Sequence, residues 1–127
     1  MARLEHFAIY AADLEALKDF YVRTMGLKVV RVGGGNPPGG YFLADDHGGA
    51  IEIIARPAGE SNARQRWVCH LAFWVDDVFA KKAELEKLGL AFEPDTEADD
   101  AEIKTCFFHD PEGNRCQLVW RKDPLTS

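Results

Sequence analysis

The sequence lacks the features of a protein that sits in a membrane, on nucleic acid or outside the cell. None of its apolar runs approaches the roughly 18 residues that a membrane-spanning helix needs. Its first residues, MARLEHF, lack the basic and then apolar build of a signal peptide. The formal net charge is -6 and no basic patch is present, which argues against binding to phosphate backbones. We therefore expect a cytoplasmic protein that binds neither membranes nor nucleic acid.

Cysteine is scarce, with three residues at no zinc-type spacing. An odd number of cysteines favours reduced thiols in the cytoplasm over a disulfide framework. Cys69 and Cys116 stand directly before His70 and Gln117, and side chains alternate between the two faces of a strand. We therefore expect both thiols to point away from these two polar residues and to pack as small buried hydrophobic groups.

What the chain does have is an internal repeat with an offset of 64 residues. The segment RLEHFAIYAADLEALKDFY at residues 3–21 corresponds to VCHLAFWVDDVFAKKAELEKLG at residues 68–89, and His70 takes the place of His6. Each half also ends in an apolar strand that carries one polar side chain, Glu52 in the first half and Gln117 in the second. A repeat of this length indicates two copies of one supersecondary unit.

Hydrophobic periodicity and turn residues predict the same element order in both halves. In the first half, Asp13 caps a helix that ends at Gly26, and the expected strands are residues 4–10, 27–32, 41–44 and 50–55. In the second half, Asp76 or Asp77 caps a helix that ends near Gly89, and the expected strands are residues 67–75, 90–93, 103–108 and 115–120. Residues 94–100 are expected to form an acidic loop.

This order predicts an α+β fold. A single domain over residues 1–127 would contain module one (about 3–56), a linker (57–66) and module two (about 67–121). Each module is expected to be a βαβββ unit with a helix on one face of its sheet and the other face bare. Together the two βαβββ modules would form a curved, open eight-stranded mixed sheet with the helices outside, and the bare faces would line a cleft.

Four polar residues are candidates for a metal site on those bare faces. If the first and last strands of each module are neighbours, His6 stands beside Glu52 and His70 beside Gln117. An ionised carboxylate between Ile51 and Ile53 is costly unless it is paired or bound to a metal. Two imidazoles, one carboxylate and one amide oxygen suit a divalent ion such as Zn, Ni, Co, Mn or Fe.

The segments HFAIYAADLEALKDFYVRTMGL, CHLAFWVDDVFAKKAELEKLG and FFHDPEGNRCQLVW resemble the vicinal oxygen chelate superfamily, which includes glyoxalase I, bleomycin-resistance proteins and extradiol dioxygenases. The resemblance extends over about residues 3–121 and is nearest to glyoxalase I-like single-domain proteins. It places metal ligands at His6, Glu52 and His70, and also at Gln117, where the family usually has glutamate. In such proteins a metal chelates two neighbouring substrate oxygens.

The resemblance implies a metal-dependent lyase or isomerase similar to lactoylglutathione lyase. Such an enzyme would act on a small α-oxo or thiol-adduct substrate through an enediolate. Glu52 is the only carboxylate among the four candidates, so we expect it to be the catalytic base. The resemblance also implies a homodimer with sites shared between chains. Two alternatives are a non-catalytic ligand- or antibiotic-binding protein of the bleomycin-resistance type and, ranked third, an Fe(II) dioxygenase.

Overall fold

The computed structural model describes residues 4–60 and 70–125 of the 127-residue chain. The chain divides into two compact units, Met1–Arg64 and Gln65–Ser127, which we term the first and second modules and describe one at a time. Cys69, residues 61–66 of the expected linker and residues 67–69 of the expected fifth strand lie outside the described residues.

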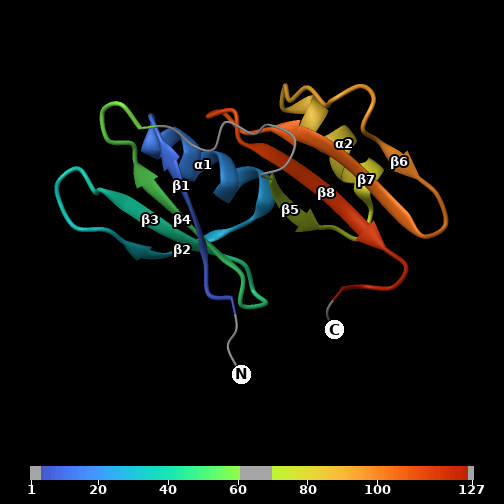
Figure 1. The fold of residues 1–127 in the computed structure, drawn as a ribbon, viewed down its shortest axis with the longest axis horizontal. Coiled ribbons are helices and arrows are strands. Elements are labelled where there is room, and N and C mark those ends of the chain that lie inside the picture. The colour runs from blue at the N-terminus through green and yellow to red at the C-terminus, as the bar shows by residue number, and fades with distance from the viewer. Residues whose placement is uncertain (1–3, 61–69, 126–127) are drawn as a thin grey trace. The chain divides into compact units, whose positions relative to one another are not determined.

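The first module is a four-stranded mixed sheet with one helix (Figure 1). Its elements are β1 (Phe7–Ala11), α1 (Leu14–Met25), β2 (Lys28–Val32), β3 (Gly40–Ala44) and β4 (Ala50–Ala55). The strand order is β1-β4-β3-β2, so the first and last strands of the module are neighbours. They pair in parallel, whereas β4 pairs with β3 and β3 with β2 in antiparallel fashion.

The second module repeats this topology. Its elements are β5 (His70–Trp74), α2 (Val78–Lys87), β6 (Ala98–Asp99), β7 (Ile103–His109) and β8 (Arg115–Arg121). The strand order is β5-β8-β7-β6, with β5 and β8 parallel and the other two pairs antiparallel. Two βαβββ modules of an α+β protein are therefore confirmed. That the two sheets join into one curved eight-stranded sheet stays a prediction.

Both helices begin at an aspartate, as the sequence predicts. The Asp13 carboxylate accepts a hydrogen bond from the Ala16 backbone N–H at 3.0 Å, and Asp77 accepts one from Ala80 at the same distance. These bonds satisfy N–H groups that have no partner within the helix. Helix α1 ends at Gly26, whose positive φ of 67° is a left-handed conformation that glycine adopts without a steric penalty.

Each helix packs against one face of its own sheet (Figure 1). Helix α1 contacts β3 and β4, and helix α2 contacts β7 and β8. In the first module the buried apolar side chains of this layer include Leu17 and Tyr21 of the helix and Leu43 and Ile53 of the sheet. In the second module they include Val78, Leu85, Phe108 and Leu118. We call the other face of each sheet, opposite its helix, the distal face.

The expected cysteine packing agrees with the structure where it can be seen. Cys106 and Cys116 are both free thiols and both fully buried, at 1% and 0% exposure. Burial raises the pKa of the Cys106 thiol to about 11, so this residue stays protonated at neutral pH. A buried and protonated thiol such as Cys106 is a poor nucleophile.

One expected strand is wrong. Residues 90–93 form no strand; Phe92 makes only an isolated bridge to Phe108, and the sixth strand is instead β6 (Ala98–Asp99), inside the expected acidic loop. Pro94 has no N–H group to continue a ladder, and Glu93 makes one backbone bond, from its N–H to the Phe107 carbonyl at 2.8 Å. The chain therefore leaves β7 at Pro94 and rejoins it at Ala98.

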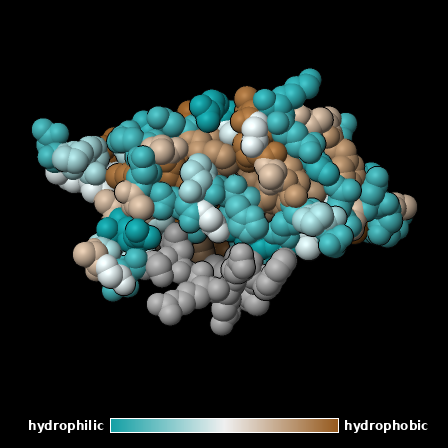
Figure 2. Space-filling view, turned by 90° about the horizontal axis from the view of Figure 1, so that it is seen from above, coloured by the Kyte–Doolittle hydropathy of each residue, from teal (hydrophilic) through white to brown (hydrophobic). Residues whose placement is uncertain are grey.

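Among the described residues, neither helix has the length and apolar character to cross a membrane. On the face shown in Figure 2, apolar surface lies among hydrophilic side chains. Exposed apolar residues occur on the edge strand β2, where Val30 is 61% and Val32 is 55% exposed. That strand also carries Lys28 and Arg31, and its pairing with β3 contains an irregularity between Val29 and Arg31. Charges and irregular pairing of this kind discourage edge-to-edge association.

Candidate metal and substrate site

The distal face of the first module carries a carboxylate at its centre. Glu52 lies in β4 between Ile51 and Ile53, which are 7% and 0% exposed and face α1. Alternation along the strand therefore turns Glu52 to the distal face. Its direct neighbours across the sheet are Ala8 in β1 and Phe42 in β3.

His6 lies next to this carboxylate. It precedes β1, two residues before the partner of Glu52, and its Nε2 atom is 3.5 Å from Glu52 Oε1. The ring also meets Phe42 edge to face, with centroids 5.2 Å apart and an interplanar angle of 82°. Two side chains that are 46 residues apart in sequence are thus brought together by the parallel pairing of β1 with β4.

The other nitrogen of His6 is held by Glu5, whose Oε1 lies 2.9 Å from His6 Nδ1. An ionised carboxylate can only accept, so we assign the ring proton to Nδ1 in neutral His6, which leaves the Nε2 lone pair facing Glu52. A carboxylate behind a histidine is a common way to orient a metal ligand. Two atoms each about 2.1 Å from one ion stand roughly 3.0–3.4 Å apart at octahedral or tetrahedral angles. The separation of 3.5 Å therefore fits a pair of ligands to one divalent ion.

The second module places its equivalent residues in the same register. Ala72 is the partner of Gln117, and Gln117 is the partner of Phe107. His70 lies two residues before Ala72 and meets the Phe107 ring nearly edge to face, at 5.7 Å between centroids and 73°. The histidine and phenylalanine pair of the first module is therefore repeated, with Phe107 in the place of Phe42.

Gln117 differs from Glu52 in its surroundings. It is only 8% exposed, and its Nε2 atom lies 2.8 Å from Thr105 Oγ1. The Thr105 hydroxyl donates its single proton to the Leu118 carbonyl at 2.8 Å, so toward Gln117 it can only accept. This fixes the orientation of the amide, with nitrogen toward Thr105 and oxygen away from it. The oxygen is thus the atom of Gln117 that suits a metal.

The four predicted ligands therefore lie as two pairs, one on the distal face of each module. Within residues 4–60 and 70–125, no three His, Cys, Asp or Glu side chains are grouped as a metal cluster. Each module contributes at most two of the predicted donors, so a four-ligand centre requires both a first and a second module. The roles of His6, Glu52, His70 and Gln117 as ligands stay a prediction.

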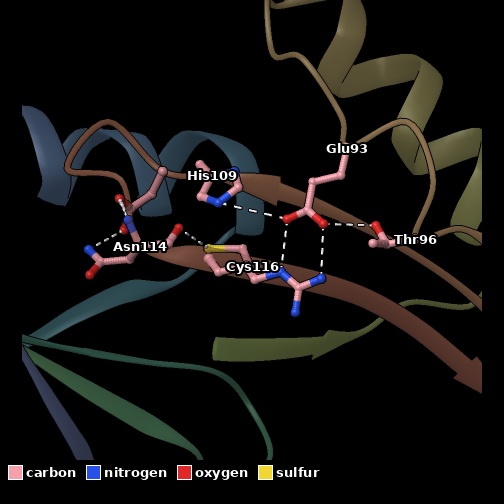
Figure 3. Close-up of polar contacts among 7 residues, drawn as sticks. Glu93, Thr96, His109, Asn114 and Cys116 are labelled. Atoms are coloured by element: carbon pink, nitrogen blue, oxygen red, sulfur yellow. Dashed lines mark hydrogen bonds and ion pairs between the residues drawn. The ribbon is translucent and has the colours of Figure 1, made fainter. Parts of the chain in front are cut away.

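A buried ion pair lies beside the distal face of the second module (Figure 3). Arg115 donates from Nε to Glu93 Oε2 at 2.8 Å and from Nη2 to Glu93 Oε1 at 2.9 Å. Thr96 also donates to this carboxylate, at 2.8 Å, and His109 Nε2 lies 3.7 Å from it. The side chains of Arg115 and Glu93 are only 7% and 10% exposed. The Arg115 guanidinium holds the pKa of Glu93 below its usual range, against the opposing effect of burial.

This ion pair is connected to the repeated histidine. The Arg115 guanidinium stacks on the Phe107 ring, 3.8 Å from its centroid, and the same ring meets His70. Arg115 is also the cross-strand partner of His70. This arrangement could not be predicted from the sequence, because the expected strand at residues 90–93 contains Glu93.

Sequence reasoning missed other contributors to the site as well. Glu5 escaped notice since it is a surface residue next to His6, and Thr105 since a single hydroxyl in a strand carries no pattern. Phe107 could have been found, because its spacing of ten residues before Gln117 matches that of Phe42 before Glu52. His47 is exposed, while the side chain of His109 is 41% exposed and lies near Glu93.

Solved structures share this fold. TnmS3, an antibiotic-binding protein from Streptomyces sp. CB03234, is 22% identical with a TM-score of 0.77, over 96% of this chain and 98% of that one. A glyoxalase family protein from Enterococcus faecalis is 28% identical with a TM-score of 0.69, over 93% and 97%. The trypanothione-dependent glyoxalase I of Leishmania major is 22% identical with a TM-score of 0.75, over 94% and 86%. A search of curated proteins finds no match.

The family described as the Glyoxalase/Bleomycin resistance protein/Dioxygenase superfamily matches residues 3–118. This chain belongs to the Glyoxalase/Bleomycin resistance protein/Dioxygenase superfamily.

Proposed function

We propose that this protein is a glyoxalase I-like, metal-dependent lyase or isomerase that acts on a small α-oxo compound or its thiol adduct. One observation carries the proposal: His6 Nε2 and Glu52 Oε1 stand 3.5 Å apart on the distal face, with His6 Nδ1 held by Glu5. Membership of the superfamily supports the proposal. Chelation of two neighbouring substrate oxygens by a metal needs histidine and carboxylate ligands of this kind.

In this proposal His6, Glu52, His70 and the amide oxygen of Gln117 hold a divalent ion. When bound, such an ion supplies Lewis acidity toward two neighbouring substrate oxygens. Glu52 accepts the C–H proton of the hemithioacetal carbon and returns it to the adjacent carbonyl carbon, while the hydroxyl proton passes to the former carbonyl oxygen. The substrate is thus isomerised without an external oxidant or reductant. Gln117 cannot take this role, because an amide neither gains nor loses a proton near neutral pH.

The proposal includes a homodimer. Each module has only two of the four donors, and by resemblance to the superfamily the first module of one chain would meet the second module of another. A dimer with shared sites would then supply complete donor sets. Sedimentation of the protein with and without a divalent ion tests this part of the proposal, and a monomer that retains full activity contradicts it.

The experiment that tests the reaction combines elemental analysis with one substitution. Protein purified without chelators is expected to contain about one divalent ion per chain. It should convert the hemithioacetal of an α-oxoaldehyde and a thiol into the hydroxyacid thioester, measured by thioester absorbance. Glu52→Gln keeps the shape of the side chain but removes the base, so turnover is expected to fall by roughly a hundredfold or more. Glu102→Gln, an exposed glutamate of the second module, serves as the matched control. Unchanged turnover in Glu52→Gln removes Glu52 from its role.

A second candidate function is binding of an aromatic ligand without chemistry. The observation in its favour is the set of aromatic side chains at the distal faces, Phe42, Phe107 and the 46% exposed Trp74, together with the structural likeness to TnmS3, an antibiotic-binding protein. Metal-free protein that binds aromatic compounds with quenching of tryptophan fluorescence, and that turns over no hemithioacetal, would favour this function.

A further inference from the structure

The irregular pairing of β2 with β3 changes the direction of Arg31. Val29 is the partner of Leu43, and Leu43 is fully buried on the side of α1. Strict alternation would return Arg31 to that same side, because it lies two residues after Val29. Arg31 is instead the partner of Phe42, so Val30 and Arg31 together oppose one residue. A bulge of this kind re-aims a side chain, and here it turns Arg31 to the distal face.

The bulge completes a row of four residues across the first sheet. In order from β1 to β2 these are Ala8, Glu52, Phe42 and Arg31. Neighbouring strands are about 4.8 Å apart, so the Cα atoms of Glu52 and Arg31 are separated by roughly 10 Å, with the Phe42 ring between them. The Glu52 and Arg31 side chains form no ion pair in the described residues, so a small organic molecule lying over the Phe42 ring would be within reach of both.

Arg31 is exposed, and no ion pair or hydrogen bond of its guanidinium is formed within the described part of the chain. In contrast, Lys28 of the same strand is paired with Asp46 at 2.9 Å. The second module also has an arginine beside the equivalent ring. There Arg115 stacks on Phe107 and binds the Glu93 carboxylate at 2.8 and 2.9 Å. In the first module Arg31 is the cross-strand neighbour of the Phe42 ring, and no carboxylate among residues 4–60 and 70–125 is paired with its guanidinium.

We propose that Arg31 binds an anionic group of the substrate, a carboxylate at the end remote from its two neighbouring oxygens. This inference rests on the proposed function, because it takes the reacting end to lie at His6 and Glu52. An apolar middle part then covers Phe42, and the guanidinium binds the carboxylate through two parallel hydrogen bonds. The selected substrates are small oxo or hydroxy-oxo compounds that carry one negative charge, such as thiol adducts with a terminal carboxylate.

The test measures binding rather than turnover. The probes are 4-(hydroxyacetyl)benzoate, whose carboxylate lies across the ring from its two neighbouring oxygens, and its neutral methyl ester. Dissociation constants are measured by titration calorimetry or NMR for the wild-type protein, Arg31→Gln, Arg31→Lys and the matched control Lys28→Gln. The Lys28→Gln variant removes the same charge from the same strand, so it reports any general electrostatic effect.

We expect the acid to bind the wild-type protein more tightly than the ester, and Arg31→Gln to weaken the acid about three- to tenfold while leaving the ester unchanged. Arg31→Lys should restore part of the preference, and Lys28→Gln should change it by less than about twofold. An unchanged acid-to-ester ratio in Arg31→Gln, an equal loss in Lys28→Gln, or wild-type protein without a preference for the acid would each overturn the assignment.

The outcome is separate from that of the proposed function. The Glu52→Gln variant reports whether the protein has the proposed base. The acid-to-ester ratio reports Arg31 even if that variant retains its turnover. Conversely, an active enzyme whose ratio does not depend on Arg31 refutes this inference and leaves the proposed reaction standing.

Discussion

Replacing Gln117 with glutamate, the residue usual at this position in the family, is expected to destabilise the metal-free protein in a pH-dependent way. The amide nitrogen of Gln117 donates to Thr105 Oγ1, whose only proton is already donated to the Leu118 carbonyl. A carboxylate in its place would face the hydroxyl oxygen with no proton between the two atoms. Either Thr105 turns away from Leu118, or the two oxygens separate.

The expected loss of unfolding free energy follows from leaving a buried polar group without a hydrogen bond. Loss of one hydrogen bond, with its partner left unpaired, costs about 1–3 kcal/mol of unfolding free energy. Because position 117 is only 8% exposed, burial also disfavours the charged form and raises the pKa of the new carboxyl in the folded state. The protonated acid, by contrast, can donate its O–H to Thr105 and restore the bond. The variant should therefore match the wild type below the unfolded-state pKa of about 4.3 and lose stability as the pH rises through the raised folded-state value.

The assay is urea denaturation of metal-free wild type and Gln117→Glu at several pH values between about 4 and 8. The difference in unfolding free energy should grow by about 1–3 kcal/mol across this range. Gln117→Met, which has no ionisable group, is the control and should show a difference that is independent of pH. A pH-independent difference for Gln117→Glu would refute the assigned amide orientation. Added Ni²⁺ or Zn²⁺ should stabilise Gln117→Glu more than the wild type if position 117 is a ligand, and equally if it is not.

Two further predictions concern packing and charge elsewhere. Arg115→Ala leaves Glu93 buried without its main partner and is expected to lower the unfolding free energy by roughly 3–5 kcal/mol, measured by thermal or chemical denaturation. Because Arg115 lowers the pKa of Glu93, the wild-type pair should stabilise the protein above the usual glutamate pKa and lose that contribution as the pH falls through the lowered value. Arg115→Ala should lack this pH dependence. Gly40→Ala would place Cβ only 2.8 Å from the Ile53 carbonyl oxygen in the neighbouring strand, so it should lower the unfolding free energy by about 1–3 kcal/mol. Gly34→Ala is the control, because a Cβ at Gly34 meets nothing within 4 Å, and it should be near neutral. Equal melting temperatures of the two variants would contradict the close approach at Gly40.

Most of the fold could be predicted from the internal repeat. Two copies of strand, capped helix and three strands follow from equivalent residues such as Asp13 and Asp77, whose carboxylates cap both helices. The parallel pairing of first and last strands is a topological option that the repeat permits, and it places His6 beside Glu52. The strand expected at residues 90–93 was wrong because tertiary contacts decide it: Glu93 uses its side chain for Arg115 and its backbone for a single bond to Phe107.

The parts of the site that escaped prediction depend on register shifts and on individual hydrogen bonds. A bulge between Val29 and Arg31 leaves no mark in the alternation of a β-branched, charged segment such as KVVRV. The role of Thr105 depends on which carbonyl its hydroxyl meets, and that is set by the pairing of β7 with β8. Neither is a property of residue type at a fixed spacing.

The two modules differ in the polar residue of their last strand and in what surrounds it. Duplication gave both sheets the same distal positions, a histidine, a phenylalanine and a polar residue in the last strand. In the second module the polar residue is a nearly buried amide bonded to an accepting hydroxyl, and the nearby arginine is neutralised by Glu93. A carboxylate there would be charged, desolvated and opposed by Thr105. In the first module Glu52 is 27% exposed, with an imidazole at 3.5 Å and an exposed arginine two strands away. In the proposed reaction, proton transfer therefore falls to Glu52, the carboxylate of the first module, whereas Gln117 of the second module offers only a neutral amide oxygen.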